Sequence, residues 1–283
     1  MKKYRLIALD IDGTLLSPQS QLTPRTVRAV HEAIGAGYVV TLATGRNWTE
    51  SRSILTDLRF AGPCVFVGGA MVVDTRRGQT LYRQQMHADL ARELCGLFEG
   101  VGHAACALQD TIVAGVDYLI SDGIGLSDAL TRWLKVTAAT FRHLPAGELP
   151  RHGHEHTVRV GIVAPPQEVE LIQARLDADF GRRVVRHAIH VPAYGVDVLE
   201  AFDPQVSKWR GVLEIAGRHG IDGSEVIAVG DDVNDIPMLQ SAGLGVAMGN
   251  ARPGVRESAA RTIGSNAQDG LAEFLESVVA GKV

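Results

Sequence analysis

The sequence predicts an α/β protein in which a Rossmann-like, doubly wound parallel sheet is interrupted by an inserted α+β domain. Three observations support this class. Short runs of consecutive apolar residues alternate with helical segments near the N-terminus, as in sheets that are covered on both faces. The same pattern returns near the C-terminus. The middle of the chain differs in composition, because it carries eight of the ten histidines.

Five apolar runs are expected to be strands of this sheet. In chain order they are residues 6–10, 38–43, 64–67, 226–229 and 245–250. Each run is continuous rather than alternating, which indicates burial on both faces. The first two runs flank a predicted helix, and a strand, a helix and a second strand form a right-handed parallel crossover.

The helix between the first two strands has clear end signals. Thr23 is an N-cap residue, Pro24 fits the first helical position, and glycines at 35 and 37 stop the helix. Its apolar residues recur with helical spacing, so we expect one buried face made of Val27, Val30 and Ile34. Downstream, a helix rich in apolar residues is expected to begin near Lys208, after Ser207.

The inserted domain is predicted over residues 81–190, which leaves residues 1–80 and 191–283 for the sheet domain. Within the insert, residues 157–163 alternate as a strand and residues 166–181 are expected to be a helix. Three of its histidines alternate in GELPRHGHEH, namely His152, His154 and His156. On a strand they would share a face, as metal ligands do, but no acidic or cysteine partner has suitable spacing, so an exposed loop is the preferred interpretation.

Composition excludes several classes of function. The 283 residues carry a formal net charge of −4 with a pI near 6.2, which argues against nucleic acid or an anionic membrane as the main partner. No apolar run approaches the roughly 18 residues of a membrane span, and the N-terminus does not resemble a signal peptide. The three cysteines lack metal spacing. A cytoplasmic protein is expected.

Polar residues gather where the predicted strands end. Asp10 and Asp12 follow the first strand, Thr44 follows the second, and Asp231 with its acidic neighbours follows a late one. In open parallel sheets ligands bind beyond the carboxyl ends of the strands. Several carboxylates there would repel one another without a hard cation, and oxygen ligands favour Mg²⁺. Together with Lys208 and a helix N-terminus, these groups favour binding of an anion such as phosphate.

Two other phosphate or metal motifs do not fit. A calcium loop that begins at Asp10 would need an acid or amide at position five and a glutamate at position twelve, where the chain has Thr14 and Gln21. A Walker-type loop, G-x-x-x-x-G-K-[ST], is absent from the sequence.

The ordered segments LDIDGT, TGR, VSK and GDDVND resemble the haloacid dehalogenase superfamily of phosphohydrolases. The form GDDVNDIPML and the position of the insert, between TGR and VSK, resemble its Cof-type branch, which has a large α/β cap of type C2. The resemblance covers nearly the whole chain. It implies a catalytic core of residues 1–80 and 191–283 and a cap of residues 81–190 that selects the substrate.

The resemblance also implies roles for individual residues. Asp10 would be the nucleophile that forms an aspartyl-phosphate, and Asp12 the general acid and base, an assignment that suits a buried carboxyl beside another anion. Mg²⁺ would be held by Asp10, the backbone carbonyl of Asp12 and Asp231. The implied phosphate-binding residues are Ile11, Thr44, Gly45, Lys208 and Asn234, with Asp235 and Arg46 in supporting positions.

Each assignment has a structural alternative. An aspartate after a strand is commonly a turn residue or a cap, and Asp232 in particular is expected to cap the following helix. The chain also departs from the family pattern. Gly68 and Gly69 stand where an Asn-Gly pair is usual, and Trp209 stands where a glycine commonly follows the motif lysine. Both departures affect substrate specificity rather than chemistry.

The leading functional hypothesis is a Mg²⁺-dependent phosphatase acting on a small phosphorylated metabolite. A sugar phosphate is the first expectation, and nucleotide-derived phosphates and cofactor phosphates such as pyridoxal phosphate are the alternatives. A phosphomutase or phosphotransferase would pass the aspartyl-phosphate to a second substrate. A phospho-accepting signalling module would also use Asp, Thr and Lys, but such modules are about half this length and have no need of Asp12. The protein is expected to act as a monomer or homodimer.

Overall fold

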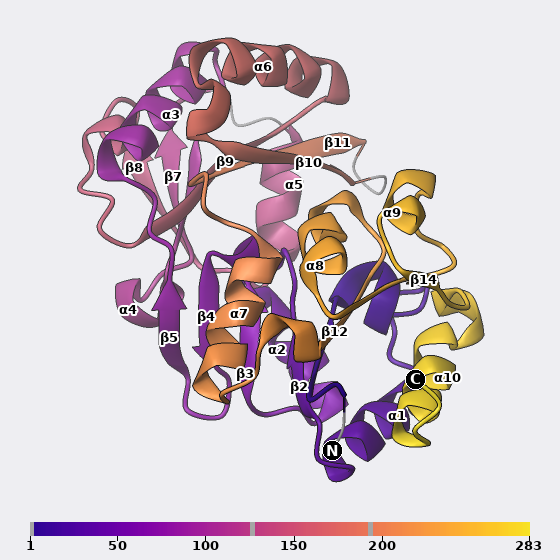
Figure 1. Cartoon of the computed structure of the whole chain (residues 1–283). Coiled ribbons are helices and arrows are strands. Elements are labelled where there is room, and N and C mark those ends of the chain that lie inside the picture. Colours follow the sequence, from indigo (N-terminus) through magenta and orange to yellow (C-terminus); the bar gives the residue numbers. More distant parts are fainter. Residues whose placement is uncertain (1–2, 125–127, 192–194) are drawn as a thin grey trace. The chain divides into compact units, whose positions relative to one another are not determined.

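The computed structural model describes residues 3–124, 128–191 and 195–283, and the chain forms two compact units (Figure 1). The first unit comprises Met1–Asn47, Ser51–Tyr82 and Ser207–Val283. The second comprises Trp48–Glu50 and Arg83–Val206. The second unit is therefore inserted into the first, and each has its own sheet.

The N-terminal part of the first unit, including the elements at its junctions, contains β1 (Leu6–Leu9), η1 (Ile11–Leu15), α1 (Pro24–Gly35), β2 (Val39–Leu42), α2 (Trp48–Leu58), β3 (Pro63–Phe66), η2 (Val67–Gly69), β4 (Met71–Asp74) and β5 (Gln79–Arg83). The C-terminal part contains α7 (Lys208–Arg218), η5 (Gly223–Glu225), β12 (Val226–Gly230), η6 (Val233–Asp235), α8 (Ile236–Ser241), β13 (Leu244–Ala247), α9 (Pro253–Glu257), β14 (Arg261–Thr262), η7 (Asn266–Gln268) and α10 (Gly270–Val279).

The main sheet of the first unit is parallel, with the strand order β14-β13-β12-β1-β2. A single parallel bridge from Ala43 to Val65 places β3 beside β2, and β3, β4 and β5 form a further sheet in that order. Strand β1 is central and pairs with strands from both ends of the chain, since Leu6 is opposite both Val226 and Val39. The predicted doubly wound parallel sheet is confirmed.

Helices cover this sheet and bury their apolar residues against it. Helices α7 and α8 bury Val212, Ile215 and Leu239 against the β1 and β12 side chains. Helix α1 begins as predicted, because the Thr23 hydroxyl accepts a hydrogen bond from the Thr26 backbone at 3.1 Å. Its predicted buried face is partly wrong. The buried residues are Thr26, Ala29, Val30 and Ala33, whereas Ile34 is exposed.

Gly69, which matches the glycine of the usual Asn-Gly pair, has a packing explanation. Gly69 adopts a φ of +107°, and a Cβ built there would lie 1.9 Å from the carbonyl oxygen of Ser207, the N-cap of α7. The turn η2 can therefore approach the start of α7 only with a glycine at this position. Trp209 is half-buried against the core of the first unit, and a Cβ built on Gly223 would lie 3.0 Å from its ring.

The second unit contains α3 (Ala88–Gly100), β6 (Cys106–Gln109), α4 (Thr111–Ala114), β7 (Tyr118–Asp122), α5 (Asp128–Val136), β8 (Phe141–Pro145), η3 (Leu149–Arg151), β9 (Thr157–Ala164), α6 (Pro166–Asp179), η4 (Gly181–Arg183), β10 (Val185–Val191) and β11 (Val196–Phe202). Its sheet has the order β10-β11-β9-β6-β7-β8 and is antiparallel except for the β7–β8 pair. Helices α3 and α6 lie together on one face (Figure 1), over a core that includes Leu94, Val160 and Leu199.

The second unit extends further than the sequence suggests. The insert was predicted to end at residue 190, but the structure continues the unit to Val206. The reason is strand β11, which pairs with β10 on one side and β9 on the other and so belongs to the interior of this sheet. The predicted strand and helix after residue 156 match β9 and α6.

The three alternating histidines lie in the loop before β9 rather than on a strand. The expected exposed loop is wrong for His154, which is fully buried. Its Nε2 contacts the Leu149 carbonyl and its Nδ1 the Thr157 hydroxyl, each at 2.9 Å. These histidines do not belong to any group of side chains that lies close enough together to hold a metal ion, as far as the described residues show. Among the described helices, none is long and apolar enough to cross a membrane.

Candidate active site

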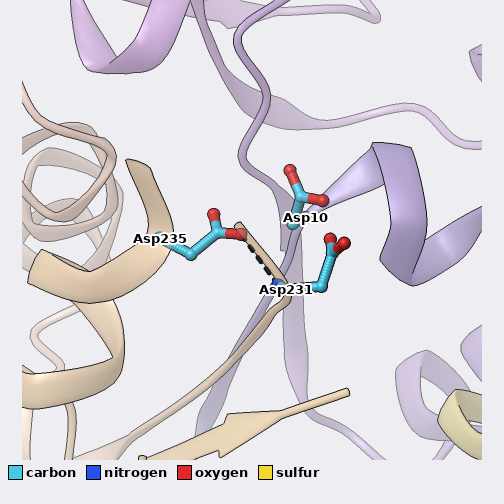
Figure 2. Close-up of side chains that lie close together, drawn as sticks. All are labelled: Asp10, Asp231 and Asp235. Carbon is cyan, nitrogen blue, oxygen red and sulfur yellow. Dashed lines mark hydrogen bonds between the residues drawn. The ribbon is translucent and has the colours of Figure 1, made fainter. Parts of the chain in front are cut away.

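Three aspartates meet at the carboxyl edge of the parallel sheet in the first unit. Asp10 directly follows β1, and Asp231 directly follows β12, which is paired with β1 (Figure 2). Asp235 ends the short helix η6 after β12. One carboxylate oxygen of each residue lies within 4.8 Å of the others. The adjacency of β1 and β12 is what joins residues that are more than two hundred positions apart in the chain.

Lys208 neutralises part of this cluster. It is the first residue of α7, its side chain is 2% exposed, and its Nζ lies 2.6 Å from Oδ1 of both Asp10 and Asp235. Burial alone would lower the pKa of Lys208, but the two carboxylates raise it overall, so the ammonium stays protonated. The second oxygen of Asp235 accepts hydrogen bonds from the backbone nitrogens of Asp231 and Asp232 at 2.9 and 3.0 Å.

The pKa values of the remaining two carboxyls are raised. For Asp10 the main cause is burial, followed by the charge of Asp235, and Lys208 only partly opposes them. For Asp231 burial and the charge of Asp235 raise the pKa to about 6. In both groups a bound metal cation would therefore compete with a proton for the carboxylate.

The turn η1 brings the Asp10–Thr14 segment against Asp231. Gly13 has a φ of +79°, and a Cβ at this position would lie 2.1 Å from an oxygen of Asp231. The hydroxyl of Thr14 donates to Oδ1 of Asp231 at 3.1 Å. Asn250, beyond the end of β13, donates from its Nδ2 to Oδ2 of Asp231 at 3.3 Å. Glycine at position 13 thus permits the close contact of the two loops.

Asp12 differs from the expectation of a buried carboxyl. Its side chain is 52% exposed and forms a two-point ion pair with Arg46, with Nε to Oδ2 at 2.8 Å and Nη2 to Oδ1 at 2.6 Å. Asp10 and Asp12 flank Ile11, whose side chain is buried. The two carboxylates that are adjacent in the sequence therefore have different surroundings.

The predicted phosphate-binding residues lie on neighbouring loops of the first unit. Thr44 is buried, and its hydroxyl accepts a hydrogen bond from the Arg46 backbone at 3.1 Å. The Nδ2 of Asn234 lies 3.8 Å from the position that a Cβ of Gly45 would occupy. Within the described structure, Oδ1 of Asn234 is buried without a hydrogen-bond partner. A buried amide oxygen of this kind stays unsatisfied until a hydrogen-bond donor reaches it.

Sequence reasoning missed two contacts of the cluster, those of Thr14 and Asn250. Thr14 is part of the DGT turn, and Asn250 follows the carboxyl end of β13 just as the other site residues follow their strands. That shared position was a usable signal. Asp232, in contrast, behaves as predicted, because its side chain caps η6 by accepting from the Val233 nitrogen at 2.8 Å.

The residues fit a divalent cation in their chemistry. The donors are carboxylate oxygens, which Mg²⁺ prefers over nitrogen or sulfur. Both oxygens of Asp235 are already engaged, by Lys208 and by backbone nitrogens, so Asp10 and Asp231 are the better ligands. The acidic cluster could therefore hold a metal ion.

The parallel sheet and the lysine-neutralised acidic site at its carboxyl edge define an α/β protein with an acidic site in one unit and a second unit inserted into its chain. A family model agrees: the chain belongs to the haloacid dehalogenase-like hydrolases, whose model matches residues 7–275. The resemblance to its Cof-type branch is confirmed.

Two named relatives are phosphatases, and each matches this chain along nearly its whole length. The chain is 29% identical over 279 residues to 5-amino-6-(5-phospho-D-ribitylamino)uracil phosphatase YitU of Bacillus subtilis (strain 168), covering 97% of each chain. It is 28% identical over 282 residues to pyridoxal phosphate phosphatase YbhA of Escherichia coli (strain K12), covering 96% of this chain and 98% of the relative. The chain is accordingly a phosphoric monoester hydrolase.

Solved structures share the fold. A haloacid dehalogenase-like hydrolase from Bacteroides thetaiotaomicron has a TM-score of 0.79 at 22% identity, with 98% of this chain and all of that chain covered (100%). One from B. subtilis has a TM-score of 0.78 at 21% identity, with 96% and 99% covered.

Proposed function

We propose that this protein is a Mg²⁺-dependent phosphatase that hydrolyses a small phosphorylated metabolite through an aspartyl-phosphate on Asp10. The observation that carries this proposal is the ammonium of Lys208 shared between Asp10 and Asp235, with Asp231 beside them. It joins a carboxylate nucleophile, a fixed cation and a potential metal ligand in one buried place. Phosphoryl transfer needs little beyond such positioning and charge.

In the first step, an oxygen of Asp10 forms a bond to phosphorus while the bond from phosphorus to the leaving alcohol breaks. Asp10 must be ionised for this step. Lys208 favours the ionised form of Asp10 and opposes the effect of burial. The same contact at 2.6 Å fixes one oxygen of Asp10 and thereby orients the carboxylate.

Asp12 moves the protons. We assign it to protonate the leaving alcohol oxygen in the first step and to take a proton from water in the second, as water attacks phosphorus and releases Asp10 and inorganic phosphate. Its exposed position supports this role, because a carboxyl that serves water and substrate in turn must be accessible. Arg46 would orient the group.

Mg²⁺ would be held by the side chains of Asp10 and Asp231 and by the backbone carbonyl of Asp12. When bound, it neutralises negative charge on the transferring phosphoryl group. Thr44, Asn234, Lys208 and the backbone of the Ile11 and Gly45 segments would contact the phosphoryl oxygens. The place of Asn234 supports this, because its Nδ2 is a hydrogen-bond donor and lies 3.8 Å from the position that a Cβ of Gly45 would occupy.

We assign catalysis to the first unit and selection of the substrate to the second, because all the reacting groups lie in the first. The two named relatives act on a phosphorylated ribityl compound and on pyridoxal phosphate. Small phosphomonoesters are therefore the substrate class, with sugar and sugar-alcohol phosphates first and pyridoxal phosphate next.

The test is steady-state release of inorganic phosphate from a panel of such metabolites with Mg²⁺, using Asp10→Asn as the blank. We expect Mg²⁺-dependent turnover that Asp10→Asn abolishes. Brief reaction with a ³²P-labelled substrate followed by acid quenching should label the wild-type protein and leave Asp10→Asn unlabelled. Transfer of label to a second metabolite without phosphate release would instead identify a phosphotransferase, and stable labelling without turnover a signalling module.

A further inference from the structure

The side chain of Asn250 connects three loops of the first unit around the acidic cluster. Its Nδ2 lies 2.9 Å from the carbonyl oxygen of Gly13 and 3.3 Å from Oδ2 of Asp231. Its Oδ1 lies 2.9 Å from the backbone nitrogen of Asn266. One amide thus contacts the turn after β1, the turn after β12 and the η7 segment.

These contacts fix which way the amide points. A backbone N–H can only donate, so the atom that faces Asn266 must be the amide oxygen. The NH₂ group then faces the Gly13 carbonyl and the Asp231 carboxylate, which are both acceptors. Every partner of Asn250 is therefore chemically matched, and the opposite orientation would oppose donor to donor and acceptor to acceptor.

Asp231 is held on both oxygens by two different loops. Thr14 donates to Oδ1 at 3.1 Å and Asn250 donates to Oδ2. A carboxylate oxygen has more than one lone pair, so each can accept such a bond and still bind a metal. Hydrogen bonds of this kind orient a ligating carboxylate and adjust its affinity for the metal.

The hydrogen bond from Asn250 to Gly13 has a second effect, because it also holds the turn after β1. Gly13 adjoins Asp12, whose backbone carbonyl is a proposed metal ligand, and Asp231 is another. Asn250 therefore ties together the two loops that would supply ligands from opposite ends of the chain. Because Asn250 is itself exposed to solvent, its hydrogen bonds contribute little to global stability compared with buried ones.

We infer that Asn250 is a positioning residue for metal binding, which holds the Asp231 carboxylate and the Gly13 turn in the orientation that a divalent cation requires. This inference rests on the proposed function. Removing the amide leaves every proposed ligand in place but removes one of the two hydrogen bonds that orient Asp231. Metal affinity should then fall while the fold persists.

The experiment measures metal binding directly on the full chain after removal of metal with a chelator. Mg²⁺ is titrated by isothermal calorimetry, and Mn²⁺ binding is followed by electron paramagnetic resonance. Asn250→Ala and Asn250→Leu, the second of similar size to asparagine, should each raise the Kd by roughly 10–100-fold. The Mg²⁺ concentration that half-saturates phosphatase activity should rise by the same factor.

The matched control is Asn266→Ala. It keeps the backbone N–H that binds Asn250 but removes the side-chain bond to the Leu16 carbonyl at 2.8 Å, which joins the η7 segment to the chain just after η1. Its Kd for Mg²⁺ should equal that of the wild type. An equal loss of affinity in Asn266→Ala would assign the effect to loop anchoring and overturn the inference, as would unchanged binding in both Asn250 variants.

The outcomes also separate this inference from the proposed function. A wild-type chain that binds neither Mg²⁺ nor Mn²⁺ would overturn the metal-dependent mechanism and the role of Asn250 with it. A wild type that binds Mg²⁺, with Asp231→Asn losing it and the Asn250 variants keeping it, would overturn only the role of Asn250.

Discussion

The ammonium of Lys208 lies 2.6 Å from Oδ1 of Asp10 and at the same distance from Oδ1 of Asp235, with all three side chains buried. One cation is thus shared between two carboxylates from the segments that follow β1 and β12. Charged groups are costly to bury unless they are paired and hydrogen-bonded. The lysine therefore makes it feasible to hold a dense set of acids away from water.

Replacing Lys208 by methionine should destabilise the metal-free protein strongly. The substitution leaves Asp10 and Asp235 buried without their cation, and loss of one partner of a buried ion pair costs roughly 3–5 kcal/mol. Urea unfolding at neutral pH measures the change. Adding Asp235→Asn to the same variant should recover part of the loss, because one buried charge is then removed. A loss below about 1 kcal/mol, the value for surface pairs, would contradict the pairing.

Asp12→Asn should abolish catalysis without unfolding the protein. Its side chain is half-exposed, and exposed ion pairs contribute only about 0–1 kcal/mol, so the free energy of unfolding should change little. Phosphate release should fall by roughly 10²- to 10⁴-fold, the usual contribution of a general acid or base. Glu276→Gln is a matched control, because it breaks a two-point pair with Arg25 of similar exposure elsewhere in the first unit. Full activity in Asp12→Asn would refute the proton-transfer role.

The sequence predicted those features that depend on local pattern. The strands of the first unit were recognisable because consecutive apolar residues are typical of a buried parallel sheet, and the start of α1 because Thr23 and Pro24 act within one turn. The convergence of Asp10, Asp231 and Lys208 followed from the general position of sites at the carboxyl edge. These expectations needed no knowledge of distant contacts.

The remaining features depend on contacts that are distant in the sequence. Ile34 has the helical spacing of a buried residue, yet the packing of α1 exposes it. The end of the insert was missed because the apolar sequence of β11 would suit a strand of either unit. Only its pairing with β9 and β10 assigns it to the second unit. The exposure of Asp12 likewise depends on its distant partner Arg46. The partners of His154, Leu149 and Thr157, are close in the sequence, but no local pattern predicts the loop that brings them together.

The stabilising effect of Mg²⁺ should increase with pH. The pKa of Asp231 is raised from 3.8 to about 6, mainly by burial, so the folded metal-free protein binds a proton more tightly than the unfolded chain does. The contribution of Asp231 to stability is therefore present below about pH 4 and is lost as pH rises through 6. Mg²⁺ competes with that proton, so its binding relieves the loss.

Thermal unfolding with and without Mg²⁺ tests this coupling. The rise in Tm on adding Mg²⁺ should be small at pH 5 and should grow up to pH 7.5, with most of the change around pH 6. In Asp231→Asn the rise should be small at every pH. An effect of Mg²⁺ that is the same at pH 5 and pH 7.5 in the wild type would show that proton release from this cluster is not linked to metal binding.

His154 should stabilise the second unit in its neutral form. Burial lowers its pKa to about 4 from an ordinary value of 6.5. Because the Leu149 carbonyl can only accept, Nε2 must carry the proton, and Nδ1 then accepts from the Thr157 hydroxyl. His154→Ala removes two buried hydrogen bonds, which should cost about 1–3 kcal/mol at pH 7.5.

The pH dependence of that cost separates a buried neutral histidine from simple loss of side-chain volume. Since the folded-state pKa is lowered, the contribution of His154 is complete above pH 6.5 and is lost as pH falls toward 4, where the unfolded chain binds the proton more tightly. In urea titrations, the difference between wild type and His154→Ala should therefore shrink from pH 7.5 to pH 5. His219→Gln, at an exposed histidine, should show no such trend. A difference that stays constant with pH would mean that packing alone accounts for the effect of His154.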